Sequence, residues 1–240
     1  MLLKAEGLSV NYGTIEALRD VSFHVGEQEF VALLGPNGAG KSSALKAVTG
    51  LLPLVGGQIT AGTVRFRGLP IAGLRTDELV KHRICLVPEG RHVFRSLSVL
   101  ENLEMGGYTV ASRDLVRDRI AESLKLFPQL QARAKTKAGA LSSGEQQMLA
   151  IARALVADPE LLIADEPSLG LSPVAVDTVF EKLREINGSG TAILIVEQKV
   201  DVALAYCGRA YVFNLGCVVK EGDRQALLDD ASLKPLFLGG

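Results

Sequence analysis

Four short runs of apolar residues recur along the chain, and each stops at glycine, proline or an acidic residue. They are "EFVALLGP" (29–36), "RICLVPEG" (83–90), "ELLIADEP" (160–167) and "TAILIVEQ" (191–198). A strand with one solvated face alternates apolar and polar residues, whereas strands covered on both faces are apolar throughout. The four runs therefore predict buried strands of a parallel sheet.

A second kind of strand is expected in the first part of the chain. In "TVRFRG" (63–68), Val64 and Phe66 alternate with arginines, so the apolar and charged side chains face opposite sides. Similar short alternating runs occur in "LLKAEGLSVNYG" (2–13) and "ALRDVSFHV" (17–25). These segments predict a small antiparallel lobe beside the parallel sheet.

Helical spacing of apolar residues dominates residues 98–156, as in "RDLVRDRIAESLKLF". A further helix is predicted in "SPVAVDTVFEKLREING" (172–188), with Ser172 as N-cap, Pro173 at the first helical position and Gly188 beyond the end. This helix lies between two buried strands, and strand–helix–strand order favours a parallel α/β sheet. We expect one domain over residues 1–240, with a core of 1–88 and 157–240 and an inserted, mainly helical lobe of 89–156.

Composition narrows the function classes. The 240 residues are 48% hydrophobic and 22% charged, with a net charge of -1, which gives no electrostatic indication of nucleic-acid binding. No apolar run approaches the roughly 18 residues of a membrane span, and the N-terminal residues lack the features of a secretory signal. Three scattered cysteines without CxxC spacing favour free thiols in a reducing compartment. Together these features predict a cytosolic location.

The segment "GPNGAGKS" matches the phosphate-loop pattern G-x-x-x-x-G-K-[ST] and lies between a predicted strand and a helix. Gly38 and Gly40 let backbone amides converge on phosphate oxygens at the positive end of the helix dipole. Lys41 would contact the β- and γ-phosphates, and the Ser42 hydroxyl would bind Mg²⁺. The expected nucleotide-binding residues are Gly35, Pro36, Asn37, Gly38, Ala39, Gly40, Lys41, Ser42 and Ser43.

Two acidic residues, Asp165 and Glu166, end the third apolar run. Parallel sheets place their ligand crevice at the carboxyl ends of the strands. A nucleotide held by the phosphate loop needs a carboxylate for its metal, so Asp165 is the expected magnesium ligand. Glu166, one residue further on, would orient and polarise the attacking water.

The segment "LSSGEQQMLAIARAL" (141–155) resembles the signature helix of ATP-binding cassette (ABC) ATPases, usually written LSGGQ. The order of phosphate loop, signature, "LLIADEP" and "SLGLSP" is the order in that family, and the resemblance covers essentially the whole chain. It implies a P-loop NTPase core with a mostly parallel sheet, an antiparallel β lobe and a helical signature lobe. It also implies hydrolysis of ATP with Mg²⁺.

The resemblance gives further residues a role. The residues themselves show an S-x-x-E capping box at the start of this helix. In the family this helix start meets the γ-phosphate held by the opposite subunit of a dimer, and Tyr12 corresponds to the aromatic residue that stacks on adenine. Taken alone, Tyr12 at a turn would instead favour core packing. The residues expected to act in the partner's site are Ser142, Ser143, Gly144 and Glu145.

Three positions depart from the family pattern. Ser143 replaces the usual first glycine of the signature, Glu89 replaces a loop glutamine, and Gln198 replaces the switch histidine. Strand alternation sends Glu197 and Gln198 to opposite faces. Because a carboxylate is repelled by phosphate and an amide can donate to it, Gln198 is expected to face the γ-phosphate and Glu197 to face solvent or a cation. Glu89 is expected to have a metal-linked or conformational role.

Within the family, "LVPEGRHVFRSLSVLENL", "DEPSLGLSP", "IVEQ" and "LFLGG" look most like an ATPase subunit of branched-chain amino acid importers. The alternatives are an importer of urea or short amides, an exporter of lipid or polysaccharide, and a soluble ABC protein of DNA repair or translation. The importer reading implies a second ATPase subunit, identical or related, transmembrane permease subunits and an external binding protein, with the chain on the cytoplasmic face of the inner or plasma membrane. Val93, Phe94 and Leu97 would form the docking surface, or else belong to the core.

Overall fold

A six-stranded sheet forms the centre of the computed structural model, which describes residues 1–230. The strand order is β10-β9-β3-β8-β7-β6, with β9, β3, β8, β7 and β6 parallel and β10 antiparallel to β9. The strands are β3 (Phe30–Leu34), β6 (Ile84–Val87), β7 (Leu161–Asp165), β8 (Ala192–Glu197), β9 (Arg209–Asn214) and β10 (Cys217–Asp223). The four apolar runs are thus four neighbouring parallel strands, which confirms the predicted sheet.

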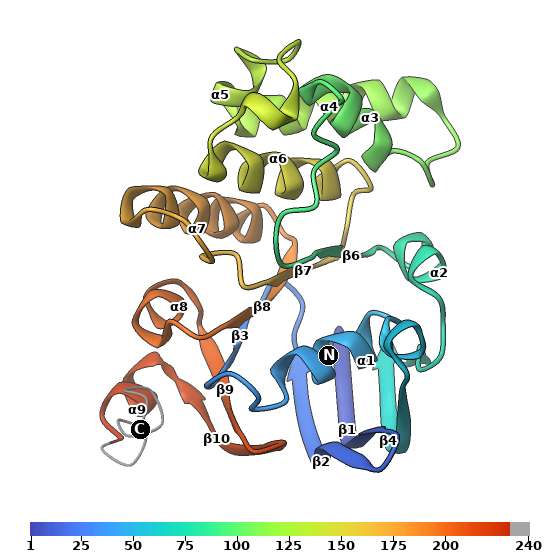
Figure 1. Ribbon diagram of the computed structural model, residues 1–240, viewed down its shortest axis with the longest axis vertical. Helices are drawn as coiled ribbons and strands as arrows, with labels where there is room; N and C mark the ends of the chain where they lie inside the picture. Colours follow the sequence, from blue (N-terminus) through green and yellow to red (C-terminus); the bar gives the residue numbers. More distant parts are fainter. Residues whose placement is uncertain (231–240) are drawn as a thin grey trace.

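A separate antiparallel sheet is built from the N-terminal segments in the order β2-β1-β4-β5. Its strands are β1 (Leu3–Tyr12), β2 (Ile15–Val25), β4 (Gly57–Phe66) and β5 (Leu69–Pro70). Val64 and Phe66 are buried and Arg65 is exposed, so the alternating pattern correctly predicted which face is covered. In Figure 1 this sheet lies at the opposite end of the molecule from the group of helices α3 to α6.

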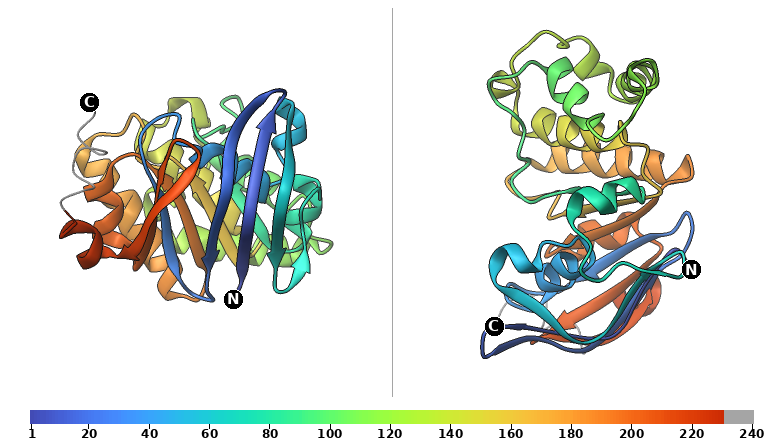
Figure 2. Two further views of the ribbon diagram at one scale, coloured as in Figure 1. Left: turned by 90° about the horizontal axis from the view of Figure 1, so that it is seen from below. Right: turned by 90° about the vertical axis from the view of Figure 1, so that its right-hand side faces the viewer.

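The helices that position the site lie around the central sheet. Helix α1 follows the first central strand, α3 to α6 gather at one end of the molecule, and α6 lies beside α7 in both Figure 1 and the right-hand view of Figure 2. The helices are α1 (Lys41–Val48), α2 (Thr76–Lys81), α3 (Val99–Gly106), α4 (Arg113–Leu126), α5 (Pro128–Gln131), α6 (Ser143–Leu155), α7 (Pro173–Gly188), α8 (Val200–Tyr206) and α9 (Arg224–Leu228). Short 3₁₀ turns occupy Leu52–Val55 and Ala138–Ala140.

Strand β8 shows how the central sheet is covered on both faces. Ile193 and Ile195 belong to a core that includes side chains of α6 and α7, whereas Leu194 and Val196 belong to a second core with α1 and the antiparallel sheet. All of these side chains are fully buried. A strand between two apolar layers has no solvated face, which explains its uninterrupted apolar sequence.

The start of α7 was predicted correctly and its end was not. The Ser172 hydroxyl accepts a hydrogen bond from the backbone N–H of Ala175, with Pro173 in the first turn. Gly188 is the last helical residue rather than the residue beyond the end, and Ser189 is the C-cap. The glycine with a left-handed backbone is Gly190, with φ of 113°, and its conformational freedom serves the turn into β8.

Within residues 1–230, none of the helices is both long enough and apolar enough to cross a bilayer. The segment "LFLGG" (236–240), which contributed to the resemblance, lies outside the described residues.

Candidate nucleotide site

The phosphate loop connects β3 to α1 in the predicted strand–loop–helix order. Gly40 is the N-cap of α1 with φ of 103°, and Gly38 has φ of 77°, both in the left-handed region that favours glycine. A Cβ atom on Gly35 would lie 2.3 Å from the carbonyl oxygen of Phe213 in β9. Gly35 therefore permits close packing of the loop against the sheet, and Gly38 and Gly40 permit the backbone turn that points amides at an anion.

Lys41 lies folded into its own loop. Its Nζ donates hydrogen bonds to the carbonyl oxygens of Gly35 at 2.7 Å and Pro36 at 3.0 Å, and the side chain is buried. Burial lowers the pKa of Lys41, while the charges of Glu166 and Asp165 act in the opposite direction. The ammonium group is thus held at the centre of the loop, where the phosphates of a nucleotide would lie.

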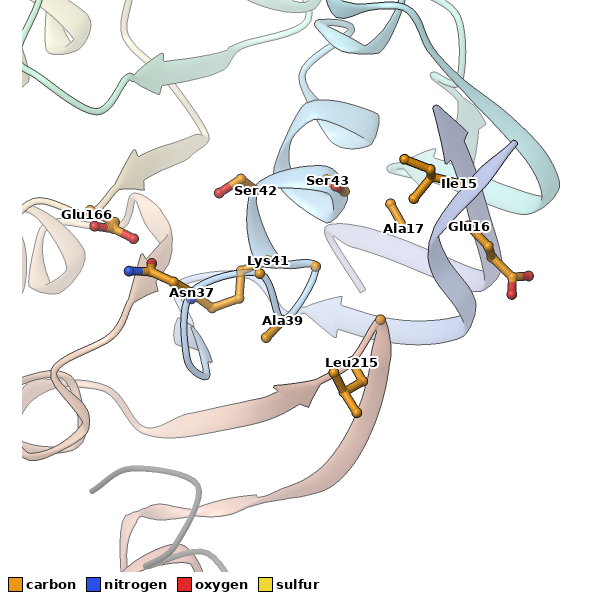
Figure 3. Close-up of a pocket in the computed structure, with 13 residues that line it drawn as sticks. Ile15, Glu16, Ala17, Asn37, Ala39, Lys41, Ser42, Ser43, Glu166 and Leu215 are labelled. Carbon is orange, nitrogen blue, oxygen red and sulfur yellow. The ribbon is translucent and has the colours of Figure 1, made fainter. Parts of the chain in front are cut away.

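A cavity of about 380 Å³ opens in front of the loop, and Figure 3 shows the side chains around it. Glu166 lies on one side of this cavity, and the β1–β2 hairpin with the β9–β10 turn lies on the other. Apart from the loop, the sequence patterns had identified only Glu166 among the lining residues. The cavity is lined by Ile15, Glu16, Ala17, Asn37, Gly38, Ala39, Gly40, Lys41, Ser42, Ser43, Glu166, Leu215 and Gly216.

The cavity-lining residues of the β1–β2 hairpin and the β9–β10 turn belong to no sequence motif, so the sequence patterns did not identify them. Gly40 brings the hairpin close, because a Cβ there would lie 2.7 Å from a methyl group of Leu18 and 3.0 Å from the carbonyl oxygen of Ala17. Tyr12 does not line the cavity; its ring is next to Gly57, where a Cβ would lie 2.7 Å from it, and its hydroxyl is buried without a hydrogen-bond partner. Adenine stacking by Tyr12 therefore stays a prediction.

Asp165 has the features of a cation ligand. Its Oδ1 atom is buried and has no hydrogen-bond partner. Burial, followed by the charges of Glu166 and Glu89, raises the pKa of Asp165 to about 6. A buried carboxylate oxygen left unpaired is costly, and a bound divalent cation would remove both that cost and the repulsion. By their chemistry, Asp165 and the Ser42 hydroxyl thus fit the donor set of a nucleotide-bound Mg²⁺.

Glu89 is exposed on the loop after β6, and its negative charge contributes to raising the pKa of Asp165. Among residues 1–230, no group of three or more His, Cys, Asp or Glu side chains forms a metal cluster. Such a cluster is not needed for nucleotide-bound Mg²⁺, which takes most of its ligands from phosphate oxygens and water. The metal-linked role of Glu89 stays a prediction.

Glu166 and Gln198 are in direct contact. The Gln198 Nε2 atom donates a hydrogen bond of 2.6 Å to Oε1 of Glu166, and the Glu166 backbone N–H donates to the carbonyl oxygen of Val196. Glu166 has φ of 45°, a left-handed conformation that a side chain rarely adopts. Such a conformation persists where surrounding contacts hold it, and it is concentrated at functional sites. The amide of Gln198 therefore shares one site with the carboxylate of Glu166.

One of the two expected surroundings of Glu197, solvent, was wrong. The charge of Glu197 does act on a cation, since it works to raise the pKa of Lys41. The face of β8 that carries Glu197 is not solvated, however: the residue is only 1% exposed and accepts hydrogen bonds from Ser168. The reason is that the turn after Glu166 folds over the end of β8 and covers that face. The covering turn is 29 residues away in sequence, so the local pattern contained no sign of it.

The signature segment forms the start of α6. Ser142 is the N-cap, its hydroxyl accepts from the backbone N–H of Glu145, and the Glu145 carboxylate accepts from the Ser142 N–H, which confirms the capping box. Ser142 and Ser143 are exposed, whereas Gly144 is buried, and a Cβ on it would lie 3.0 Å from that of Ala175 in α7. None of these four residues lines the cavity of its own chain.

A glycine-rich loop between a parallel strand and a helix, opposite a pair of carboxylates at the carboxyl end of the same sheet, defines a P-loop nucleotide-binding protein. Comparison with protein families matches residues 18–169 to the ABC transporter family. The chain belongs to this family, as an ABC-type ATPase.

Three known proteins illustrate the relationship. The chain is 41% identical to the high-affinity branched-chain amino acid transport ATP-binding protein BraG of Pseudomonas aeruginosa, with 100% of both chains covered. It is 36% identical to the probable branched-chain amino acid transport ATP-binding protein LivF of Archaeoglobus fulgidus, with 99% of both covered. Its fold is similar to a dimeric ATP-binding cassette in a post-hydrolysis state bound to ADP and Pi, with a TM-score of 0.80, 28% identity, and 93% of this chain and 99% of that chain covered.

Proposed function

We propose that this chain is the ATP-hydrolysing subunit of a membrane importer for branched-chain amino acids. The observation that carries the proposal is the 41% identity with BraG over the whole of both chains. The described residues supply the parts that ATP hydrolysis needs: a phosphate loop, a carboxylate with one buried, unpaired oxygen for Mg²⁺, and a second carboxylate held by an amide. The chain would act as a peripheral protein at the cytoplasmic face of the membrane, with residues 89–156 as a lobe inserted into the core.

The residues would divide the reaction as follows. Lys41 and the loop amides would bind the β- and γ-phosphates, and Ser42 and Asp165 would hold Mg²⁺, which offsets phosphate charge when bound. Glu166 would accept the proton of the attacking water. Gln198 would hold the Glu166 carboxylate and donate to the γ-phosphate, because an amide has two N–H donors.

A groove of about 440 Å³ offers a place for a permease subunit. Phe94 is 45% exposed and Met105 is 44% exposed, and both line this groove between β6 and the helices α3 and α6. The guanidinium of Arg153 lies 5.2 Å from the centre of the Phe94 ring and donates to the carbonyl oxygen of His92. Of the three apolar residues expected to dock, only Phe94 lines the groove, since Val93 packs against the core and Leu97 is half-buried. We propose that an apolar segment of a permease binds at Phe94.

Transport by the assembled importer tests the function. Subunits that co-purify with the chain from its native membranes would be reconstituted in vesicles with ATP on the ATPase side and a binding protein on the other. ATP-dependent uptake of radiolabelled leucine, isoleucine and valine is expected, and uptake of urea is not. Uptake of urea or acetamide instead, or ATP-dependent movement of lipid, would contradict the amino-acid assignment.

The dimer assignment is tested by Ser142→Arg. We propose that the exposed start of α6 meets the γ-phosphate of a second subunit, because it serves no part of its own chain's cavity. The variant should bind ATP as a monomer with nearly unchanged affinity and fail to dimerise, since the side chain would occupy the partner's phosphate position. Size-exclusion chromatography with Mg-ATP measures this.

Ser112→Arg is the matched control for this experiment. Ser112 is also an exposed N-cap, for α4, and its hydroxyl accepts from the backbone N–H of Leu115. Both changes remove an N-cap worth about 1 kcal/mol. A difference in dimerisation between the two variants is therefore due to the location of Ser142 at the start of α6 and not to the loss of a helix cap. ATP-dependent dimerisation and normal turnover of Ser142→Arg would contradict the composite site.

A further inference from the structure

The carboxylate of Glu197 is buried next to Gln198 and the turn that follows Glu166. Glu197, at the end of β8, is 1% exposed, and Ser168, on the turn after Glu166, is 2% exposed. The Ser168 backbone N–H donates to Oε1 of Glu197 at 2.9 Å, and the Ser168 hydroxyl donates to Oε2 at 3.0 Å. The backbone N–H of Gln198 also donates to Oε2, at 3.2 Å. Both carboxylate oxygens are therefore occupied by donors from two segments of chain.

Stability alone does not explain a carboxylate at this position. Burial raises the pKa of Glu197, and the hydrogen bonds from Ser168, Lys199 and Gln198 only partly oppose this. Replacing a buried, hydrogen-bonded charge by a well-packed apolar side chain is often neutral or stabilising. An apolar residue has no acceptor for hydrogen bonds, however, so it could not hold Ser168 and the Gln198 backbone in one fixed arrangement.

Both segments held by Glu197 lead directly to Glu166. Ser168 is two residues beyond Glu166 in the chain, and Gln198 is the residue whose amide donates to the Glu166 carboxylate. The backbone of Glu166 is itself bound to Val196, one residue before Glu197. The end of β8 thus holds Glu166 at its backbone, at its side chain and through the turn that follows it.

The far side of the turn has a second attachment. Arg91 Nη2 donates to the carbonyl oxygens of Leu169 at 3.0 Å and Gly170 at 3.2 Å. Arg91 comes from the exposed loop that also carries Glu89, so it holds the surface of the turn while Glu197 holds its buried side. The turn is therefore fixed on both sides, and only its buried attachment reaches Gln198.

We propose that Glu197 is a positioning residue for ATP hydrolysis, which fixes the turn through Ser168 and thereby aims the Glu166 carboxylate at the attacking water. Glu197 itself contacts neither nucleotide nor water in this arrangement. The inference rests on the proposed role of Glu166 as the general base, and it gives a function to a side chain that the sequence predicted to face solvent or a cation.

Glu197→Gln is the decisive variant. An amide has one oxygen where the carboxylate has two, so either the Ser168 N–H or the Gln198 N–H must face an NH₂ group. One buried donor then loses its acceptor and the turn shifts, which should lower kcat about tenfold. The dissociation constant for ATP should change less than about twofold, because the hydrogen bonds of Glu197 go to Ser168 and Gln198 and not to the phosphate loop, on which it acts only as one of three distant charges. Ser168→Ala removes only the hydroxyl bond and should lower kcat about threefold.

The double variant and a control complete the design. If Glu197 acts through Ser168, the two effects should be non-additive, and the double variant should have the kcat of Glu197→Gln alone. Ser123→Ala removes another buried hydroxyl bond, from Ser123 to the carbonyl oxygen of Ala152 in the helical region, and should leave kcat unchanged. Thermal unfolding of all variants separates lost activity from lost folding.

Two results would overturn the inference. One is a kcat of Glu197→Gln within twofold of the wild type; the other is a fall in kcat that Ser123→Ala reproduces at an equal loss of Tm. Glu166→Gln in the same assay separates this failure from failure of the proposed mechanism. If Glu166→Gln is inactive while Glu197→Gln is normal, only the positioning role of Glu197 is refuted. If Glu166→Gln turns over normally, the general-base role of Glu166 is refuted as well.

Discussion

Glu166→Gln is expected to bind ATP, to lose nearly all hydrolysis and to accumulate as an ATP-bound dimer. The glutamine oxygen can still accept the hydrogen bond from Gln198 Nε2, so the geometry of the contact is retained. An amide cannot accept a proton from water, however, and a general base contributes roughly 10²- to 10⁴-fold to the rate. Phosphate release measures the loss of turnover, and size-exclusion chromatography with Mg-ATP measures the trapped dimer.

Glu160→Gln is the matched control for Glu166→Gln. Glu160 immediately precedes the other end of β7 and accepts hydrogen bonds from Arg67 and Arg83. The same chemical change there removes ion pairs at a partly exposed site, which contribute about 0 to 1 kcal/mol, and no catalytic atom. Its turnover should stay within about twofold of the wild type. Near-normal turnover of Glu166→Gln would refute the general-base assignment.

The sequence was sufficient for the parts of the site that depend on local rules. The phosphate loop needs glycines at fixed spacing between a strand and a helix, and Gly38 and Gly40 indeed have the left-handed backbone that such a loop requires. Asp165 was expected at the site because an acid at the end of a buried strand lies at the ligand-binding edge of a parallel sheet, and its buried, unpaired Oδ1 atom fits that expectation. The capping box of Ser142 and Glu145 is likewise contained within four residues.

The remaining parts depend on contacts between distant segments. The hairpin residues Ile15 to Ala17 and the turn at Leu215 line the cavity only because the antiparallel sheet and the β9–β10 turn pack next to the loop. Glu197 is a clear example of a residue whose surroundings the local sequence pattern could not predict. Alternation along β8 decides which face a side chain takes, but whether that face meets solvent or a buried turn is decided by residues elsewhere in the chain.

Gln198→Glu should be the most damaging of three changes at the switch position. The Gln198 Nε2 atom lies 2.6 Å from Oε1 of Glu166, so the variant replaces a donor with a second carboxylate facing the first. It would also face the γ-phosphate, where like charges about 4 Å apart repel by roughly 4 kcal/mol at an effective dielectric of 20, or about 10³-fold in rate. The control is Gln225→Glu, because Gln225 also donates its amide to a carboxylate, that of Asp229, but on the exposed helix α9.

Two further substitutions separate the loss of a donor from the gain of a charge. Gln198→His should be tolerated, because imidazole can also donate to Glu166 or to phosphate. Gln198→Ala should fall between the histidine and glutamate variants, since it leaves the Glu166 carboxylate without its donor at a cost of about 1 to 3 kcal/mol. Steady-state ATPase rates with Mg-ATP should therefore decrease in the order wild type and His, then Ala, then Glu, with Gln225→Glu unchanged. A silent Gln198→Glu would show that neither the γ-phosphate nor the ionised Glu166 faces this side chain during turnover.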